Sequence, residues 1–124
     1  MSTAADTVNT FLARIGALDL EGALELFTDD CEYDNVPIGK VHGPAGIRAT
    51  LAPFLAGCTA VEWVVNHQAA TGDVVMNERT DRFEMGGRWR ALDVAGLFVV
   101  RDGRIALWRD YFDLASLQKA MSGG

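Results

Sequence analysis

Polar and apolar side chains alternate along one stretch of this sequence in a way typical of a strand that lines a reactive site. Arg79 and Asp81 are two residues apart, and Asn77 and Phe83 continue the same spacing on either side. Because successive side chains of a strand point to opposite faces, these four residues share one face. A face turned only to water has no need of Phe83, and a face turned only to a core does not tolerate unpaired charges.

Two other stretches of the sequence also combine polar and large apolar side chains on one face of a strand. Trp108, Asp110 and Phe112 share a face of a later strand, and Tyr33 and Asn35 share a face of a short early strand. An apolar pocket with a few convergent polar groups is the ordinary form of a small-molecule site. The competing interpretation is an exposed strand, on which Asp81 and Asp110 form surface ion pairs with neighbouring arginines.

The chemistry available to such a set is general acid and base catalysis. Two carboxyls in an apolar pocket resist double ionisation, and burial favours their neutral form. A guanidinium between two carboxyls that share one proton makes a neutral cluster, in which one carboxyl is an acid and the other a base. Arginine suits this position because its planar fork donates to both sides.

The elements that must position these side chains are strands late in the chain and helices early in it. Four strands, rich in β-branched and aromatic residues, are separated by glycine-containing turns that favour hairpins. They are expected at residues 59–71, 74–85, 89–100 and 105–112. A short strand is expected at residues 31–36, ended by Pro37 and Gly39.

Apolar residues at helical spacing predict the helices. They are expected at residues 4–18, at 20–27 after an N-cap at Asp19, from the segment 43–46 onward, and at 113–121. The early helices are suited to cover the apolar face of a curved antiparallel sheet. The predicted fold is α+β, a cone-shaped sheet wrapped around N-terminal helices, in a single domain over residues 1–124.

Composition excludes several classes of function. The chain has 124 residues, 49% of them hydrophobic, and a net charge of −6. An acidic chain without a basic cluster is a poor partner for nucleic acid or for an anionic membrane surface. Cys31 and Cys58 lack metal or redox spacing, so no metal or other cofactor is expected. The N-terminal residues do not resemble a secretory signal, which favours the cytoplasm.

Three motifs resemble the limonene-1,2-epoxide hydrolase family. They are residues 33–37 (YDNVP), 78–81 (ERTD) and 107–113 (LWRDYFD), and the hairpin at 102–105 (DGRI) also matches. The similarity extends over about residues 5–121. It implies the cone fold shared with nuclear transport factor 2, scytalone dehydratase and ketosteroid isomerase.

The resemblance implies a role for each of five residues. Asp110 resembles the general base that takes a proton from water, and Tyr33 and Asn35 resemble the residues that hold the same water. Asp81 resembles the general acid that protonates the epoxide oxygen. Arg79 resembles the bridge between the two carboxylates.

The implied activity is cofactor-independent hydrolysis of a small, cyclic or terpene-like epoxide to a vicinal diol, in one step. The expected pocket walls are apolar side chains of three strands: Val75, Phe83, Leu92, Val94, Trp108 and Phe112. Leu117 or Met121 of the last helix are expected to join them. Apolar residues on the outer face of the sheet predict a homodimer. They are Val64, Trp89, Leu97, Val99 and Leu107.

Three alternatives use the same fold. An isomerase or cyclase of the ketosteroid isomerase or polyketide cyclase type needs one aspartate base and no arginine between two acids. A non-catalytic binding or dimerisation module has no use for the complete five-residue set. A lyase like scytalone dehydratase needs histidine in the pocket, and His42 and His67 lie outside the three motifs.

Overall fold

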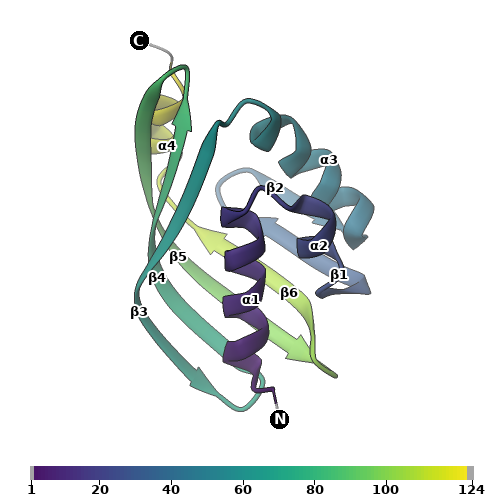
Figure 1. Ribbon diagram of the computed structural model, residues 1–124. Helices are drawn as coiled ribbons and strands as arrows, with labels where there is room; N and C mark the ends of the chain where they lie inside the picture. Colours follow the sequence, from purple (N-terminus) through teal and green to yellow (C-terminus); the bar gives the residue numbers. More distant parts are fainter. Residues whose placement is uncertain (1, 123–124) are drawn as a thin grey trace.

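A curved six-stranded sheet carries helices α1, α2 and α3 over its inner face (Figure 1). The computed structural model describes residues 2–122, so the ends of the predicted domain, residues 1, 123 and 124, lie outside the described part. The strand order is β2-β1-β6-β5-β4-β3. The helices are α1 (Ala4–Gly16), α2 (Leu20–Leu24), α3 (Gly43–Ala56) and α4 (Leu114–Met121). The strands are β1 (Phe27–Asn35), β2 (Gly39–His42), β3 (Ala60–Thr71), β4 (Val74–Met85), β5 (Arg88–Arg101) and β6 (Arg104–Tyr111).

The predicted meander of four strands is confirmed. Strands β3 to β6 pair antiparallel in sequence order, and tight turns connect them. Gly86 and Gly87 between β4 and β5 have φ values of 62° and 74°, the left-handed region that a two-residue hairpin turn requires. β3 contains a register shift between Val65 and His67, which reverses the alternation of its side chains from that point on.

Helix α1 supplies the centre of the core. A capping box between Thr3 and Asp6 satisfies two of the free N–H groups at its N-terminus. Its predicted apolar face is buried, and the ring of Phe11 lies edge-on to Phe27 and to Trp108, with centroids 5.2 and 4.9 Å apart. The helix therefore packs against strands from both ends of the chain.

The early part of the chain departs from prediction. The second helix was expected to reach Phe27, but α2 ends at Leu24, and β1 begins at Phe27 and continues through Asp29 and Asp30. Phe27 is buried against Phe11 and Trp108, so tertiary packing overrides the local helical spacing. β2 was not predicted; it pairs antiparallel with the end of β1, from Asn35 opposite Gly39 to Glu32 opposite His42.

Strand β1 also pairs with β6, and the two run parallel. The register sets Tyr33 opposite Trp108 and Asn35 opposite Asp110. The sequence predicted the strand but not its neighbour. This pairing brings two of the sequence motifs, 75 residues apart, side by side in the sheet.

None of the helices within residues 2–122 combines the length and the apolar character needed to cross a membrane.

Candidate active site

Strands β4 and β6 turn three charged side chains toward the inside of the sheet. Arg79 is fully buried, and Asp81 and Asp110 are 7% and 4% exposed. The Nε and Nη2 groups of Arg79 donate to both oxygens of Asp81 at 2.9 and 3.1 Å, and Nη2 also donates to Asp110 Oδ2 at 2.9 Å. One guanidinium therefore holds both carboxyls, and the surface interpretation of these charges is excluded.

The aromatic rings of β1 and β6 form the second part of the site. Trp108 Nε1 donates to Asp110 Oδ1 at 2.9 Å. The ring of Tyr33 stacks on Trp108 with centroids 3.8 Å apart, as the parallel register of the two strands requires. Each carboxyl thus accepts two N–H groups: Asp81 from arginine alone, and Asp110 from arginine and indole.

Two further residues support the cluster. Asn77 Oδ1 accepts a hydrogen bond from Arg79 Nη1 at 2.9 Å. Gly96, opposite Asp110 in β5, has no side chain, and a Cβ there would lie only 2.3 Å from Arg79 Nη1 and 3.0 Å from Asp110 Oδ1. Asn77 was noted in the sequence only as sharing the face, and Gly96 was not identified. Only the β5–β6 register shows why this position must be glycine.

Burial controls the protonation of the cluster. It raises the pKa of Asp81 to about 6, against the lowering effect of Arg79. It also raises the pKa of Asp110, although Arg79 and Trp108 act in the opposite direction. Burial raises the pKa of the Tyr33 hydroxyl as well, so this group stays a neutral donor. Because one guanidinium joins the two carboxyls, they titrate as one coupled group.

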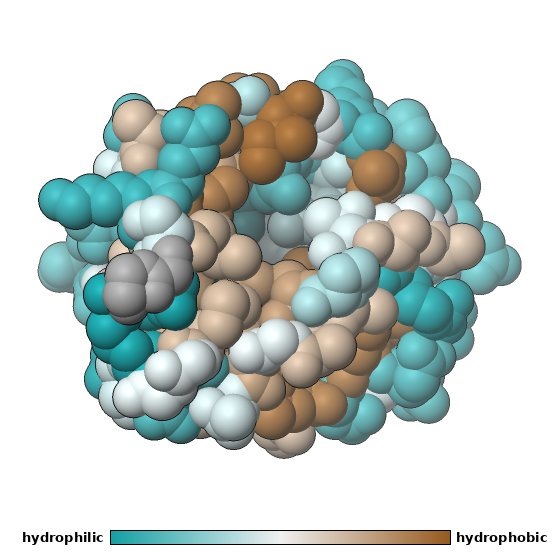
Figure 2. All heavy atoms as spheres, turned by 90° about the horizontal axis from the view of Figure 1, so that it is seen from above, coloured by the Kyte–Doolittle hydropathy of each residue, from teal (hydrophilic) through white to brown (hydrophobic). Residues whose placement is uncertain are grey.

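A cavity of about 230 Å³ opens onto these groups. Its polar wall includes Tyr33, Asn35, Asp81 and Asp110, and most of the remaining wall is apolar. Seen from above in Figure 2, the molecule is hollowed near its middle, and hydrophobic residues gather around the hollow. The arrangement combines a desolvated acid–base cluster with a small hydrophobic chamber.

The predicted walls are placed unequally. Phe83, Leu92, Val94 and Phe112 line the cavity, and so do Leu117 and Met121. Val75 and Trp108 do not line it, because both are fully buried in the core. Trp108 instead donates a hydrogen bond to Asp110. Five wall residues were not predicted, four of them from the β1–β2 loop and α3, because helical periodicity does not show which side chains border a cavity. They are Ile38, Thr50, Leu51, Phe54 and Trp63.

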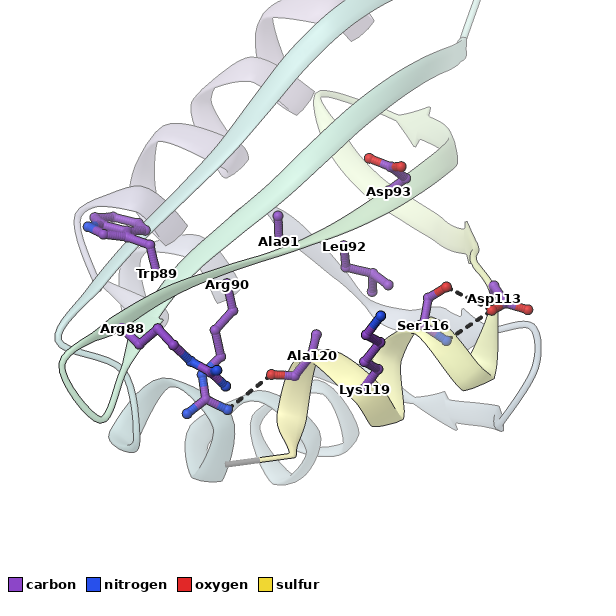
Figure 3. A pocket seen from close by; sticks show the side chains of 10 residues that line it. All are labelled: Arg88, Trp89, Arg90, Ala91, Leu92, Asp93, Asp113, Ser116, Lys119 and Ala120. Atoms are coloured by element: carbon purple, nitrogen blue, oxygen red, sulfur yellow. Dashed lines mark hydrogen bonds between the residues drawn. The ribbon is translucent and has the colours of Figure 1, made fainter. Parts of the chain in front are cut away.

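Helix α4 closes one side of the cavity and has no fully buried residue of its own. Its N-cap is Asp113, whose carboxylate accepts from the N–H of Ser116. At its other end Arg90 donates to the carbonyl of Ala120 at 3.0 Å. Figure 3 shows these contacts around a separate hollow of about 580 Å³ between β5 and α4. Neither carboxyl of the buried cluster lines that hollow.

The comparisons with known proteins point to one family. The model of the limonene-1,2-epoxide hydrolase catalytic domain matches residues 2–122. Epoxide hydrolase EphG of Mycobacterium tuberculosis is 36% identical over 118 residues, which are 94% of this chain and 78% of that protein. The structure of an M. tuberculosis LEH-like epoxide hydrolase is 34% identical and has a TM-score of 0.81, covering 95% of this chain and 88% of that one.

A more distant structure shows how widely the fold is shared. An NTF2-like protein of unknown function from Burkholderia pseudomallei is 19% identical, with a TM-score of 0.84 over 99% of this chain and 100% of that one. The predicted α+β cone is therefore confirmed by structures well beyond the epoxide hydrolases. The match over residues 2–122 and the 36% identity to EphG establish the narrower relationship: the chain belongs to the limonene-1,2-epoxide hydrolase family.

Proposed function

We propose that this protein hydrolyses a small, largely apolar epoxide to a vicinal diol, by one-step general acid and base attack of water. Epoxide hydrolysis is the activity named for the family and for both M. tuberculosis relatives. The observation that carries the proposal is the buried Arg79, which donates to Asp81 and to Asp110 beside an apolar cavity.

The charge of the cluster supports an acid paired with a base. Arg79 and one ionised carboxylate sum to zero when the other carboxyl holds a proton. Two ionised carboxylates leave a net charge of −1, and two protonated carboxyls leave +1. Both charged states are unfavourable in a site removed from water. The raised pKa values of Asp81 and Asp110 agree with the neutral state.

The neighbours of the two carboxyls support their separate roles. Asp110 lies opposite Asn35 in the β1–β6 register, and Tyr33 lies next to it on the same face. We assign the base to Asp110, with Tyr33 and Asn35 as the groups that orient the attacking water. We assign the acid to Asp81, which protonates the epoxide oxygen as the carbon–oxygen bond breaks. Water adds to the ring carbon, its proton passes to Asp110, and no covalent bond to the protein forms.

The cavity supports a compact hydrophobic substrate. Its volume of about 230 Å³ and its apolar walls suit a cyclic or terpene-like epoxide, with Phe83, Leu92, Val94 and Phe112 contacting the hydrocarbon part. Apart from the polar wall, two cavity-lining residues within residues 2–122 carry a group that could form a hydrogen bond with a substituent of the substrate. They are Thr50 and Trp63.

The outer face of the sheet supports a homodimer. Trp89, Met76 and Tyr111 are 43%, 56% and 48% exposed. Beside them are the partly exposed Val64, Leu97, Val99 and Leu107. Light scattering is expected to give twice the 13.4 kDa mass of one chain, and a mass near 13.4 kDa at micromolar concentration contradicts the dimer.

The two free cysteines, Cys31 and Cys58, support a reducing compartment such as the cytoplasm.

Incubation with limonene oxide, cyclohexene oxide and a wider panel of epoxides tests the activity. The expected product is a diol from at least one of them, formed by the wild-type protein and not by Asp110→Asn. Absence of diol from every member of the panel contradicts epoxide hydrolysis and favours an isomerase, a cyclase or a binding module.

A single turnover in ¹⁸O-water, with protein in excess over epoxide, tests direct attack. The first diol formed should already carry the heavy oxygen, because water itself attacks. A carboxylate nucleophile would deliver its own light oxygen in that turnover. A gain of two mass units on the peptide containing Asp81 or Asp110 after many turnovers would show that the one-step mechanism is wrong.

A further inference from the structure

A hydrogen-bonded chain of three side-chain amides leads from the buried Arg79 to helix α1. Asn77 Oδ1 accepts from Arg79 Nη1 at 2.9 Å, and Asn77 Nδ2 donates to Gln68 Oε1 at 3.1 Å. Gln68 Nε2 in turn donates to Asn9 Oδ1 of α1 at 3.1 Å. Asn77 is 5% exposed, so its amide is fixed by these partners and not by solvent. Asn77 and Gln68 each have one amide orientation that satisfies both of their neighbours in the chain.

The bulge in β3 puts Gln68 in this chain. Val65 pairs with Arg79 and Gln68 pairs with Asn77, while His67 pairs with Glu78. In a regular strand Val65 and His67 would share a face, and Gln68 would point to the outside. The extra residue reverses this order, so that His67 meets Glu78 on the outer surface and Gln68 meets Asn77 within. Bulges next to active sites commonly redirect a side chain in this way.

Asn77 is the acceptor for the Nη1 group of the guanidinium. Arg79 Nε and Nη2 donate to the two carboxyls, and Nη1 donates to Asn77. A buried charged N–H group without an acceptor is unfavourable, so loss of the amide would favour a rotated guanidinium. The absent side chain of Gly96 leaves the room that Nη1 and Asn77 Oδ1 occupy.

We propose that Asn77, oriented by Gln68, is a positioning residue for the reaction of this site. It holds Arg79 in the rotation that binds Asp81 and Asp110 together, and it does so as a neutral acceptor. The inference rests on the proposed function for its kinetic test, because Asn77 acts on the epoxide only through Arg79. An aspartate in its place would put a third carboxylate against one guanidinium.

The surroundings of the cluster make its titration a sensitive reporter. The titratable groups that act on Arg79 are Asp81 from β4, Asp110 from β6 and Tyr33 from β1. β3 and α1 contribute neutral groups to the chain, Gln68 and Asn9, and β5 contributes Gly96 and the ring of Phe98. A new carboxylate at position 77 would therefore act mainly on the two aspartates.

Steady-state kinetics of Asn77→Leu, Asn77→Asp and Gln68→Met test the proposal, with His67→Ala as the matched control on the outer side of the same bulge. In Asn77→Leu we expect kcat to fall about tenfold to a hundredfold, because small displacements of reacting groups have effects of that size. KM should stay within about twofold, since binding by the apolar walls is retained. Gln68→Met should lower kcat by less, and His67→Ala should leave it unchanged.

The pH dependence separates positioning from a general structural effect. In Asn77→Asp the acidic limb of the kcat profile should move upward by about one pH unit or more, because a nearby like charge holds protons on Asp81 and Asp110. A rise in KM without a fall in kcat, or an unmoved pH limb together with normal turnover in Asn77→Leu, would overturn the proposal. If Asn77→Leu does not fold by circular dichroism, Gln68→Met decides the kinetic question in the same way.

Carboxyl ¹³C NMR titration of Asp81 and Asp110 keeps this inference distinct from the proposed function. A wild-type protein that makes no diol would contradict the function alone. The titration midpoints of the two aspartates would still be expected to rise in Asn77→Asp and to remain in place in His67→Ala. Unchanged midpoints in Asn77→Asp would overturn the role of Asn77 whatever the activity.

Discussion

Two arginines three residues apart on β4 form ion pairs of opposite character. Arg82, on the outer face, donates to Glu62 at 2.7 Å and lies over the ring of Trp89, with its side chain 38% exposed and that of Glu62 58% exposed. Arg79, on the inner face, is fully buried and donates to its carboxylates at 2.9 to 3.1 Å. The outer pair has the shorter contact, whereas the inner carboxyls lie beside an apolar cavity and burial raises their pKa.

Exposure to solvent, more than the distance between the charges, decides the chemistry of these two ion pairs. Water solvates both charges of the outer pair, so the pair contributes little to folding. Burial of the inner cluster makes a second negative charge unfavourable, which favours a proton on one carboxyl. The same residue types therefore form a solvated ion pair on one face and, on the other, the buried cluster that we propose as the acid–base pair.

Replacing the inner arginine should have the largest effect. Arg79→Ala leaves two buried carboxyls without their cation, which is expected to lower the free energy of unfolding by about 3–5 kcal/mol. Turnover should be lost as well. Arg82→Ala is the matched control, and its loss should not exceed about 1 kcal/mol. Urea unfolding of both variants measures the difference, and equal losses would contradict the contrast between the two faces.

Neutralising one inner carboxyl should remove activity and leave the fold intact. Asp110→Asn and Asp81→Asn are each expected to lower kcat at least about a hundredfold, as loss of a general acid or base does. The fold survives because Arg79 keeps one carboxylate, so the cluster stays neutral. Glu62→Gln on the outer face should leave kcat unchanged. Near-normal turnover by a folded Asp110→Asn protein would refute its assignment as the base.

Filling the space at Gly96 should disturb the cluster without touching its charges. In Gly96→Ala the new methyl group would lie 2.3 Å from Arg79 Nη1, and overpacking of this kind is expected to destabilise the protein by about 1–3 kcal/mol. Gly57→Ala is the matched control, because its Cβ would meet Met85 Cε at 3.4 Å, and its backbone is in the right-handed region. Thermal unfolding compares them, and an equally stable Gly96→Ala protein would show that the cluster has room to spare.

The pH dependence of kcat should show two limbs, one for each carboxyl. The reaction needs one proton on the pair; a second proton removes the base, and loss of the first removes the acid. Because burial raises the pKa of Asp110, the proposed base, kcat should already fall, about tenfold per pH unit, before the pH drops to the ordinary aspartate value of about 4. Because burial raises the pKa of Asp81, the proposed acid, to about 6, kcat should fall as the pH rises through that region. Activity that persists undiminished down to about pH 4 would mean that burial does not raise the pKa of the base.

The inner set of residues was predictable because strand alternation is local. Arg79 and Asp81 share a face whatever strand lies beside them, and Trp108 and Asp110 follow the same rule. Partners that depend on register were not predictable. β1 pairs parallel with β6, which sets Asn35 opposite Asp110. This pairing depends on contacts across the whole sheet and not on the local sequence.

Three residues show where local patterns fail. Phe27 continues a helical spacing, but its burial against Phe11 and Trp108 draws it into a strand. Gln68 would point outward in a regular strand, and only the bulge in β3 brings it to Asn77. The sequence predicted Trp108 as a cavity wall, whereas its fully buried ring donates to Asp110 from within the core. For Trp108, the face of the strand could be inferred from the sequence, but how deeply its side chain is buried could not.

The outer pair itself should show the smallest effect, and salt should reveal its nature. A double-mutant cycle of Arg82→Gln and Glu62→Gln is expected to give a coupling energy of about 0.2–1 kcal/mol. Because the Debye length shortens from about 10 Å at 0.1 M salt to about 3 Å at 1 M, the coupling should shrink over that range. The destabilisation caused by Arg79→Ala should change little over the same range, since ions do not reach a fully buried group. A coupling energy at the outer pair that exceeds 1 kcal/mol and resists salt would mean that Trp89 shields it from solvent, and that the two faces of β4 differ less than their exposure indicates.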